Sequence, residues 1–201
     1  MLKSAWSAPS NIALVKYWGK KSGLQLPANP SVSFTLSNCH TKAKVSLVSK
    51  DEKPLSVIFE GKEKPEFLPK IQNFLSHITD ELSFLNDYSV IIESSNTFPH
   101  SSGIASSAAS MAAISSCLVS LEEKVLGRKS PSLDFERVSF LARIGSGSAC
   151  RSLFAGAASW GEYNGKGSDK FAHKVNLAGP LKTIQNKILI INSGVKKVSS
   201  T

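Results

Sequence analysis

The stretch that decides the fold reads PHSSGIASSAA and occupies residues 99–109. It follows a β-branched segment at residues 88–93 and precedes an Ala-rich segment at residues 107–121, which predicts a strand, a loop and a buried helix. Glycine and small side chains let a phosphate approach the backbone closely. The first N–H groups of a helix lack partners within it, and the helix dipole adds about half a positive charge there. The stretch therefore predicts an anion cradle, although a capped Ser/Ala-rich helix without a ligand fits these residues about as well.

The acidic residues leave the glycine- and serine-rich segments free. The chain carries 24 Lys and Arg against 15 Asp and Glu, a net charge of +9, and no Asp or Glu occurs in residues 1–50, 94–121, 137–161 or 170–201. A nearby carboxylate would repel an anion, so this pattern suits an anionic ligand, while a generally basic surface accounts for the charge alone. Nucleic acid is a second partner that the charge suggests, but the chain has no long Lys/Arg block.

Length and composition indicate a cytoplasmic protein. The 201 residues suit one medium domain, or most of one domain and the start of another. No apolar run approaches the roughly 20 residues needed to span a bilayer, and the N-terminus lacks the apolar core of a secretory signal. Cys39, Cys117 and Cys150 are widely spaced without a C-x-x-C pair, so we expect structural thiols rather than a disulfide framework or a zinc site.

The hydrophobic pattern favours an α+β fold, because early strands are followed by mixed strands and helices. The expected strands cover residues 7–17, 31–36, 43–48, 55–59, 88–93, 155–162 and 188–192. The expected helices cover residues 65–85, 107–121 and 135–144. We expect a loop at residues 94–99, and either a linker or a hairpin loop at residues 161–170.

Two further stretches carry groups that suit an anionic ligand: APSNIALVKYWGK at residues 8–20 and GSGSACRSL at residues 145–153. Lys20 and Arg151 supply positive charge, and arginine is suited to bidentate contact with phosphate or carboxylate. Ser146, Ser148 and the backbone of Gly147 form a small nest for an anion. The Tyr17 hydroxyl can donate a hydrogen bond to a substrate oxygen.

Residues 99–109 resemble the P-x-x-x-G-[LI]-x-S-S-A phosphate loop of the GHMP kinases, which include galactokinase, homoserine kinase and mevalonate kinase. Within that superfamily, residues 8–20 and 145–153 resemble diphosphomevalonate decarboxylases, and VSST at residues 198–201 is similar to a stretch these enzymes carry near mid-chain. The resemblance implies an N-terminal ATP- and substrate-binding domain at residues 1–186, like domain 2 of ribosomal protein S5. Residues 187–201 would begin a ferredoxin-like C-terminal domain that is mostly absent.

The resemblance also implies roles for particular residues. Those expected to bind the diphosphomevalonate are Tyr17, Trp18, Gly19, Lys20, Ser146, Gly147, Ser148, Ala149, Cys150, Arg151 and Thr201. Those expected to bind ATP are Asn96, Ser101, Ser102, Gly103, Ala105, Ser106 and Ser107, with Ser107 also near Mg²⁺. Lys16 would lie beside the substrate carboxylate and the catalytic aspartate, although a strand lysine can equally be a solvated surface residue. Trp18 can equally be a packing residue, and we expect His100 to be solvated.

The implied reaction uses ATP to phosphorylate the C3 hydroxyl of (R)-5-diphosphomevalonate. The 3-phosphate then leaves with loss of CO₂, which gives isopentenyl diphosphate. The family's catalytic aspartate is expected beyond Thr201, so the isolated 201 residues are expected to show no turnover. Relatives also present a substrate-binding arginine near residues 55–65, where this chain has only Lys62 and Lys64. A homodimer is possible, and we expect neither a nucleic acid nor a membrane partner.

Several other functions stay open from the sequence. A related enzyme of the superfamily could decarboxylate phosphomevalonate, or phosphorylate mevalonate at C3 and stop. A basic nucleic-acid-binding module would explain the charge but not the Gly/Ser loops. A truncated relative that only binds a ligand or partner is a third alternative.

Overall fold

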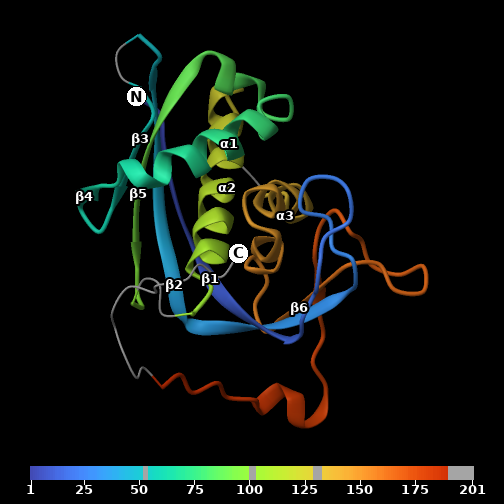
Figure 1. Cartoon of the computed structure of the whole chain (residues 1–201). Helices are drawn as coiled ribbons and strands as arrows, with labels where there is room; N and C mark the ends of the chain where they lie inside the picture. Colours follow the sequence, from blue (N-terminus) through green and yellow to red (C-terminus); the bar gives the residue numbers. More distant parts are fainter. Residues whose placement is uncertain (52–53, 100–102, 129–132, 190–201) are drawn as a thin grey trace.

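The computed structural model describes residues 1–51, 54–99, 103–128 and 133–189, and confirms the α+β class. A seven-stranded mixed sheet carries three α-helices on one face (Figure 1). The strands are β1 (Lys3–Val15), β2 (Ser31–Ser49), β3 (Ser56–Phe59), β4 (Lys62–Glu63), β5 (Tyr88–Asn96), β6 (Ala157–Trp160) and β7 (His173–Val175). The helices are α1 (Leu68–Ile78), α2 (Ser106–Val125) and α3 (Phe135–Gly145), with 3₁₀ turns η1 (Pro65–Phe67), η2 (Ser83–Asn86), η3 (Gly147–Arg151) and η4 (Gly179–Thr183).

The sheet is organised around β2, which pairs with β1 on one side and with β5 and β6 on the other. The prediction of two separate strands at residues 31–36 and 43–48 is therefore wrong. Neither Gly nor Pro interrupts β2, and its register with β1 shifts between Pro9 and Ser10, which face His40 and Leu36, and again between Ala13 and Val15. Because proline has no N–H for the ladder, residues 37–39 bulge out and β2 bends without ending.

Helix α2 lies at the centre of the core, against β1 and β2 and beside α3 (Figure 1). Every residue from Ala108 to Leu121 is buried except Ser110, which confirms the buried helix predicted from the alanines. Small side chains let the helix approach the sheet closely, while Leu118 and Leu121 fill the space around it. Burying each such leucine stabilises the fold by about 1.5–3 kcal/mol. The N-terminus of α2 is thus held by a rigid core.

Two other expectations about element boundaries need correction. The helix expected at residues 65–85 is α1 flanked by the 3₁₀ turns η1 and η2, because it ends where the Thr79 hydroxyl donates to the Leu75 carbonyl. The loop expected at residues 94–99 begins three residues later, since Ser94, Ser95 and Asn96 pair with β2 and extend β5.

The segment at residues 161–170 is the loop of the β6–β7 hairpin, the second of its two expected structures. The short strands β4 and β7 were not predicted, because they contain only two and three residues. Residues 188 and 189 have no regular structure, and the rest of the strand expected at 188–192 lies outside the described residues. No helix in the described part of the chain has the length and apolarity to cross a bilayer.

Candidate functional site

The N-terminus of α2 lacks a cap among the described residues. Ala105 precedes the helix in the left-handed conformation (φ 48°, ψ 45°), no described side chain caps the helix, and its first turn contains no carboxylate. Helix α3 differs, because the Asp134 carboxylate accepts hydrogen bonds from the N–H groups of Glu136 and Arg137. The first amides of a twenty-residue helix thus remain available to an anion.

The structure brings this helix end together with the Gly/Ser stretch that follows α3. The hydroxyl oxygens of Ser107 and Ser146 lie 3.4 Å apart, although 39 residues separate them in sequence. A cavity of about 260 Å³ joins the end of β1, the turn before α2 and the turn η3. We call it the Arg151 cavity; it is lined by Asn11, Ile12, Ala13, Lys16, Tyr17, Gly103, Ala105, Ser148 and Arg151. No carboxylate is among these lining residues.

Arg151 is a buried cation without a counterion in the described part of the chain. Its side chain is 2% exposed, and its guanidinium lies 5.8 Å from the centre of the Tyr17 ring and 5.7 Å from that of Trp160. One terminal nitrogen donates to the Ser31 hydroxyl, while Nε has no described partner. Burial lowers the pKa of Arg151 below its usual range. Because an unpaired buried charge is costly, this arrangement indicates a site that is completed by an anion.

Tyr17 lies against the same site. Its ring packs against Trp160 in a T-shaped arrangement, with the two ring centres 4.9 Å apart. A Cβ atom on Gly147 would lie 3.0 Å from the Tyr17 hydroxyl oxygen. Glycine at position 147 is therefore what lets Tyr17 approach η3. Burial raises the pKa of Tyr17, so its hydroxyl stays protonated and able to donate.

Asn11 is a functional candidate that sequence reasoning missed. Its side-chain amide donates to the Ser148 carbonyl at 3.1 Å and to the Ser152 hydroxyl at 2.7 Å, which ties β1 to η3. It is 5% exposed and lines the Arg151 cavity. The signal in the sequence was a lone amide directly before the apolar run at residues 12–15, inside the stretch at residues 8–20.

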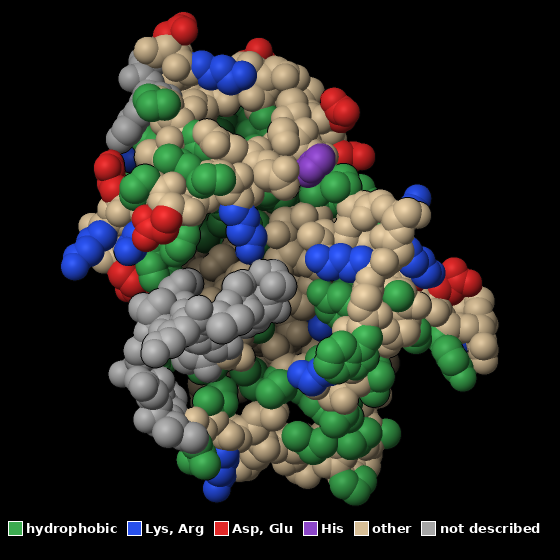
Figure 2. Space-filling model, in the orientation of Figure 1, with side chains coloured by type: hydrophobic (Ala, Val, Ile, Leu, Met, Phe, Trp, Pro, Cys, Tyr) green, Lys and Arg blue, Asp and Glu red, His purple; other side chains and the backbone are tan. Residues whose placement is uncertain are grey.

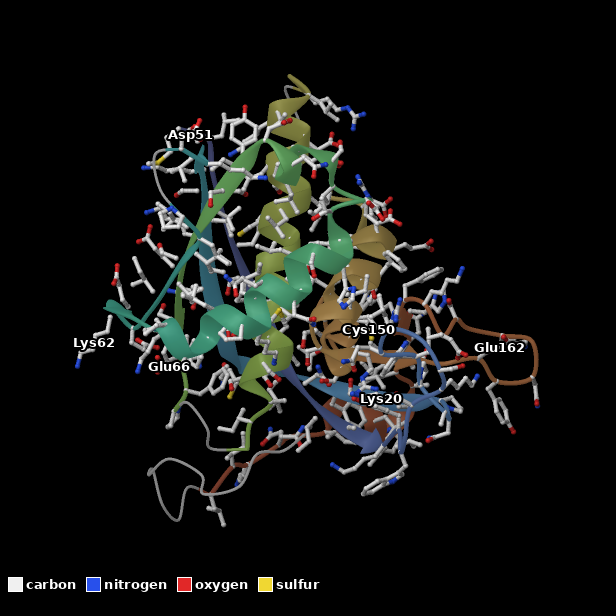
Figure 3. The ribbon with its side chains drawn as sticks, turned by 45° about the horizontal axis from the view of Figure 1, so that its top comes forward. Lys20, Asp51, Lys62, Glu66, Cys150 and Glu162 are labelled. Carbon is white, nitrogen blue, oxygen red and sulfur yellow. The ribbon has the colours of Figure 1, made fainter. Side chains whose placement is uncertain are left out.

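The residues of the loop after β1 that were expected at the substrate differ in their surroundings. Lys16 lines the Arg151 cavity and is exposed there. Trp18 is 76% exposed, and its backbone N–H donates to the Asn29 side chain at 2.7 Å. Gly19 has a φ of 75°, and Lys20 is exposed on the loop that passes beside Cys150 (Figure 3). The expected contacts of these residues with a substrate stay a prediction.

Ala149 and Cys150, both expected at the substrate, have no exposed surface. The Cys150 thiol donates to the Gly147 carbonyl at 3.0 Å, and Ser139 donates to the Cys150 carbonyl at 2.9 Å. Neither Ala149 nor Cys150 can touch a ligand unless η3 moves. Their role in the structure is to anchor the turn that carries Ser148 and Arg151.

The thiols should differ in reactivity. Burial raises the pKa of Cys117 and of Cys150 to about 12, whereas Cys39 is partly exposed with a smaller increase. Since the thiolate is the reactive form, alkylation of the folded protein at pH 8 should modify Cys39 at least roughly a hundred times faster than the other two. Peptide mass mapping after iodoacetamide treatment measures this ratio. Equal labelling of all three thiols in folded protein would contradict the described burial of η3.

A second cavity, of about 180 Å³, opens on the other side of the α2 N-terminus, between α1, β3 and β5. It is lined by Val57, Phe59, Glu66, Phe67, Lys70, Ile71, Ile92, Ser94, Ser106, Ser107, Ser110, Met111 and Ile114. We call it the α1 cavity. Its walls are mainly apolar, and serine hydroxyls lie at the helix end. The N-terminus of α2 therefore stands between two cavities.

Lys70 is the basic residue of the α1 cavity, and sequence reasoning missed it. Its side chain is exposed at the mouth, yet the surrounding protein atoms lower the pKa of its ammonium group. Lys62 and Lys64, the lysines in the region where relatives present an arginine, do not line the α1 cavity. Lys64 pairs with Glu66 at 3.2 Å, and Lys62 lies on β4, far across the molecule from Lys20 and Cys150 (Figure 3). Only the fold, which places Lys70 and Ser107 around the same cavity, could identify it.

Asn96 has a free donor. Its side-chain oxygen accepts from the Thr41 hydroxyl at 2.7 Å, while its buried side-chain nitrogen has no partner among the described residues. It lines neither the Arg151 cavity nor the α1 cavity. Four residues of the predicted site region, His100, Ser101, Ser102 and Thr201, lie outside the described residues.

The distribution of charge agrees with an anion site. Acidic side chains appear in the upper part of the face in Figure 2 and at its outer edges, whereas the lower part shows basic ones only. Among the described residues, no group of three or more His, Cys, Asp or Glu could hold a metal ion. Ser107 is a hydroxyl ligand that fits Mg²⁺ only if phosphate oxygens and water supply the other positions.

Comparison with known proteins identifies the family. A model of the diphosphomevalonate decarboxylase-like N-terminal domain matches residues 8–172. The diphosphomevalonate decarboxylase of Gibberella zeae is 37% identical over 99% of this chain and 54% of its own length. The human diphosphomevalonate decarboxylase is 34% identical over 97% of this chain and 50% of its own length. The chain thus spans about half the length of the curated relatives it matches.

Solved structures agree with this result. The mevalonate diphosphate decarboxylase of Enterococcus faecalis superposes with a TM-score of 0.71 at 33% identity, over 87% of this chain and 52% of its own. A second structure, of MDDEF in complex with MVAPP, AMPPCP and magnesium, gives a TM-score of 0.70 at 33% identity, over 87% of this chain and 51% of its own. Both similarities extend over most of the described fold.

Proposed function

The chain belongs to the diphosphomevalonate decarboxylase family, and on that premise we propose that it supplies the ATP- and substrate-binding half of such an enzyme. The reaction is the ATP-dependent decarboxylation of (R)-5-diphosphomevalonate. The C3 hydroxyl is phosphorylated, and phosphate and CO₂ then leave to give isopentenyl diphosphate. The matched relatives carry this name, and one solved relative was crystallised with MVAPP, AMPPCP and magnesium.

The observation that carries the proposal is the Arg151 guanidinium, which has no described counterion and lines a cavity without carboxylates. A diphosphate or carboxylate of the substrate would supply the missing anion and accept a hydrogen bond from Nε. Tyr17 would donate its hydroxyl to a substrate oxygen, and Lys16 would face the substrate from the end of β1. Asn11 would hold η3 in place through Ser148.

ATP is proposed to occupy the other side of the α2 N-terminus. The apolar walls of the α1 cavity suit a nucleotide base, and Lys70 at its mouth suits a phosphate or ribose oxygen. The phosphates would then lie over the uncapped amides of α2, between the two cavities. Magnesium would be held by the phosphates and the Ser107 hydroxyl, where it neutralises charge during transfer. This arrangement points the terminal phosphate toward the Arg151 cavity.

The remaining assignments are also proposals. We assign residues 1–186 to the ATP- and substrate-binding domain and residues 187–201 to the start of the second domain, in line with the family match at 8–172. We place the protein in the cytoplasm.

A substrate comparison on the complete protein tests the proposed reaction. Release of CO₂ and formation of ADP are followed with diphosphomevalonate, phosphomevalonate and mevalonate in parallel. We expect both products from diphosphomevalonate, with kcat/KM at least roughly a hundredfold higher than for the other two, because a lost phosphate leaves Arg151 unpaired. Preference for phosphomevalonate, or ADP formation without CO₂, would assign the protein to a different member of the superfamily.

A further inference from the structure

Arg143 is a second buried cation, and it lies outside both cavities. It occupies the last turn of α3 with 3% of its surface exposed, and its guanidinium lies 5.2 Å from the centre of the Phe140 ring. Nε donates to the Lys170 carbonyl at 2.7 Å, and a terminal nitrogen donates to the Leu24 carbonyl. No described carboxylate lies within ion-pair distance, although Asp169 is near enough for its charge to be felt. Burying a cation against two neutral carbonyl groups is costly, so we expect Arg143 to have a role beyond stability.

One of the two carbonyls belongs to the loop whose first residues, Lys16 and Tyr17, line the Arg151 cavity, and the other belongs to the β6–β7 hairpin. Leu24 lies in the loop at residues 16–28, which begins with Lys16, Tyr17 and Lys20. Lys170 lies at the end of the β6–β7 hairpin loop. Arg143 itself lies two residues before the Gly/Ser stretch at residues 145–153, which contains Arg151. One side chain therefore connects the loop that carries Tyr17 to the helix that carries the anion-binding turn.

Apart from the packing of the Tyr17 ring against Trp160 and Arg151, the other interactions of this loop are local or exposed. Within the loop, the Lys21 N–H donates to the Leu26 carbonyl at 3.0 Å, and the Ala28 N–H donates to the Gly19 carbonyl at 3.3 Å. The Lys21 ammonium pairs with Asp169 at 2.7 Å, but the two side chains are 52% and 23% exposed. Exposed ion pairs contribute little, so the buried guanidinium is the main link between the loop and α3.

We propose that Arg143 is a positioning residue, which holds the loop at residues 16–28 against α3 so that Lys16 and Tyr17 face the Arg151 cavity. Only the effect of Arg143 on the KM for diphosphomevalonate depends on the proposed function; the link between the loop and α3 does not. Arg143 does not line the Arg151 cavity, and two of its donors are already used by protein carbonyls. It therefore acts through the loop rather than on the ligand.

Hydrogen exchange of the loop tests the link without any turnover. In Arg143→Met, the amides of Lys21 and Ala28 should exchange roughly tenfold or more faster, because charge-assisted hydrogen bonds to the loop are lost. Arg143→Lys keeps the charge but not both donor positions, so intermediate exchange is expected. Arg137→Met is the matched control on the same helix. Its guanidinium bonds Glu122 and the Glu81 carbonyl, so the loop should exchange as in wild type.

Steady-state kinetics of the complete protein supply the second readout. Arg143→Met should raise the KM for diphosphomevalonate roughly tenfold or more while the KM for ATP stays within about twofold, because the loop borders only the substrate side. Arg143→Lys should recover part of the difference. Unchanged loop exchange in folded Arg143→Met, or equal acceleration in Arg137→Met, would overturn the proposal. If Arg143→Met does not fold, wild-type exchange in Arg143→Lys overturns it in the same way.

The two readouts separate this proposal from the proposed function. Absence of decarboxylation by the wild-type protein would remove the kinetic comparison and refute the function. Faster exchange at Lys21 and Ala28 in the same preparation would still establish the link. Conversely, active wild type with an unaffected loop in Arg143→Met would refute the positioning role alone.

Discussion

Arg151→Met should lower kcat/KM for diphosphomevalonate by roughly 30- to 5,000-fold, because truncating one partner of a buried charge pair costs about 2–5 kcal/mol. The same substitution should leave the free energy of unfolding unchanged or raise it. In the free protein Arg151 is 2% exposed, lacks a described counterion and leaves Nε unpaired. An apolar side chain of similar length removes that desolvation penalty.

The opposite directions of these two effects distinguish a binding residue from a structural one. Binding of diphosphomevalonate is measured by calorimetry, and stability by chemical denaturation of the same preparations. Arg151→Lys is the control, because it keeps the charge but loses the planar group that lies 5.8 Å from Tyr17 and 5.7 Å from Trp160. It should bind with intermediate affinity. A large loss of stability in Arg151→Met with unchanged affinity would show that Arg151 serves the core.

Ser107→Asp should stabilise the fold and weaken ATP binding at the same time. Helix α2 has no acidic residue in its first turn, so a carboxylate there should gain about 0.3–1 kcal/mol from the helix dipole. Against ATP the same carboxylate is a like charge close to the phosphates. Repulsion of about 4 kcal/mol at 4 Å and intermediate dielectric predicts affinity at least roughly a hundredfold lower.

Ser107→Asn is the matched control, since it is similar in size to aspartate and neutral. Titration of a fluorescent ATP analogue and thermal unfolding measure the two effects. Asn should reduce affinity far less than Asp, because it cannot repel phosphate. Equal losses in both variants would mean that space near Ser146, 3.4 Å away, matters and charge does not.

The sequence predicted the local parts of the fold and of the site. The Ala-rich stretch is a pattern of neighbouring residues, and α2 confirms the buried helix expected from it. The resemblance to known decarboxylases likewise depended on short stretches, and the family match confirms it.

What the sequence could not predict depends on contacts between distant segments. The unbroken β2 follows from pairing with β1, β5 and β6, which no local pattern reveals. Arg151 meets Ser31 across 120 residues, and Arg143 meets Leu24 across 119 residues. Their burial makes these arginines informative, and burial is a property of the folded chain. Lys70 was missed for the same reason, since only the packing of α1 brings it to the α1 cavity.

Acid-free segments converge at one end of α2. They come from β1, the turn before α2 and the turn η3, and their side chains line the Arg151 cavity. As a result, no acidic residue is among those that line the cavity of Arg151. We therefore propose that Arg151 and the α2 N-terminus form two halves of one phosphate-binding site.

A crystal structure with diphosphomevalonate bound will show whether Arg151 and the α2 N-terminus hold the ligand together. We expect an anionic oxygen of the ligand about 2.7–2.9 Å from Arg151 Nε, with Tyr17 donating to the same molecule. A ligand bound elsewhere, with Arg151 Nε still unpaired in a closed pocket, would contradict it.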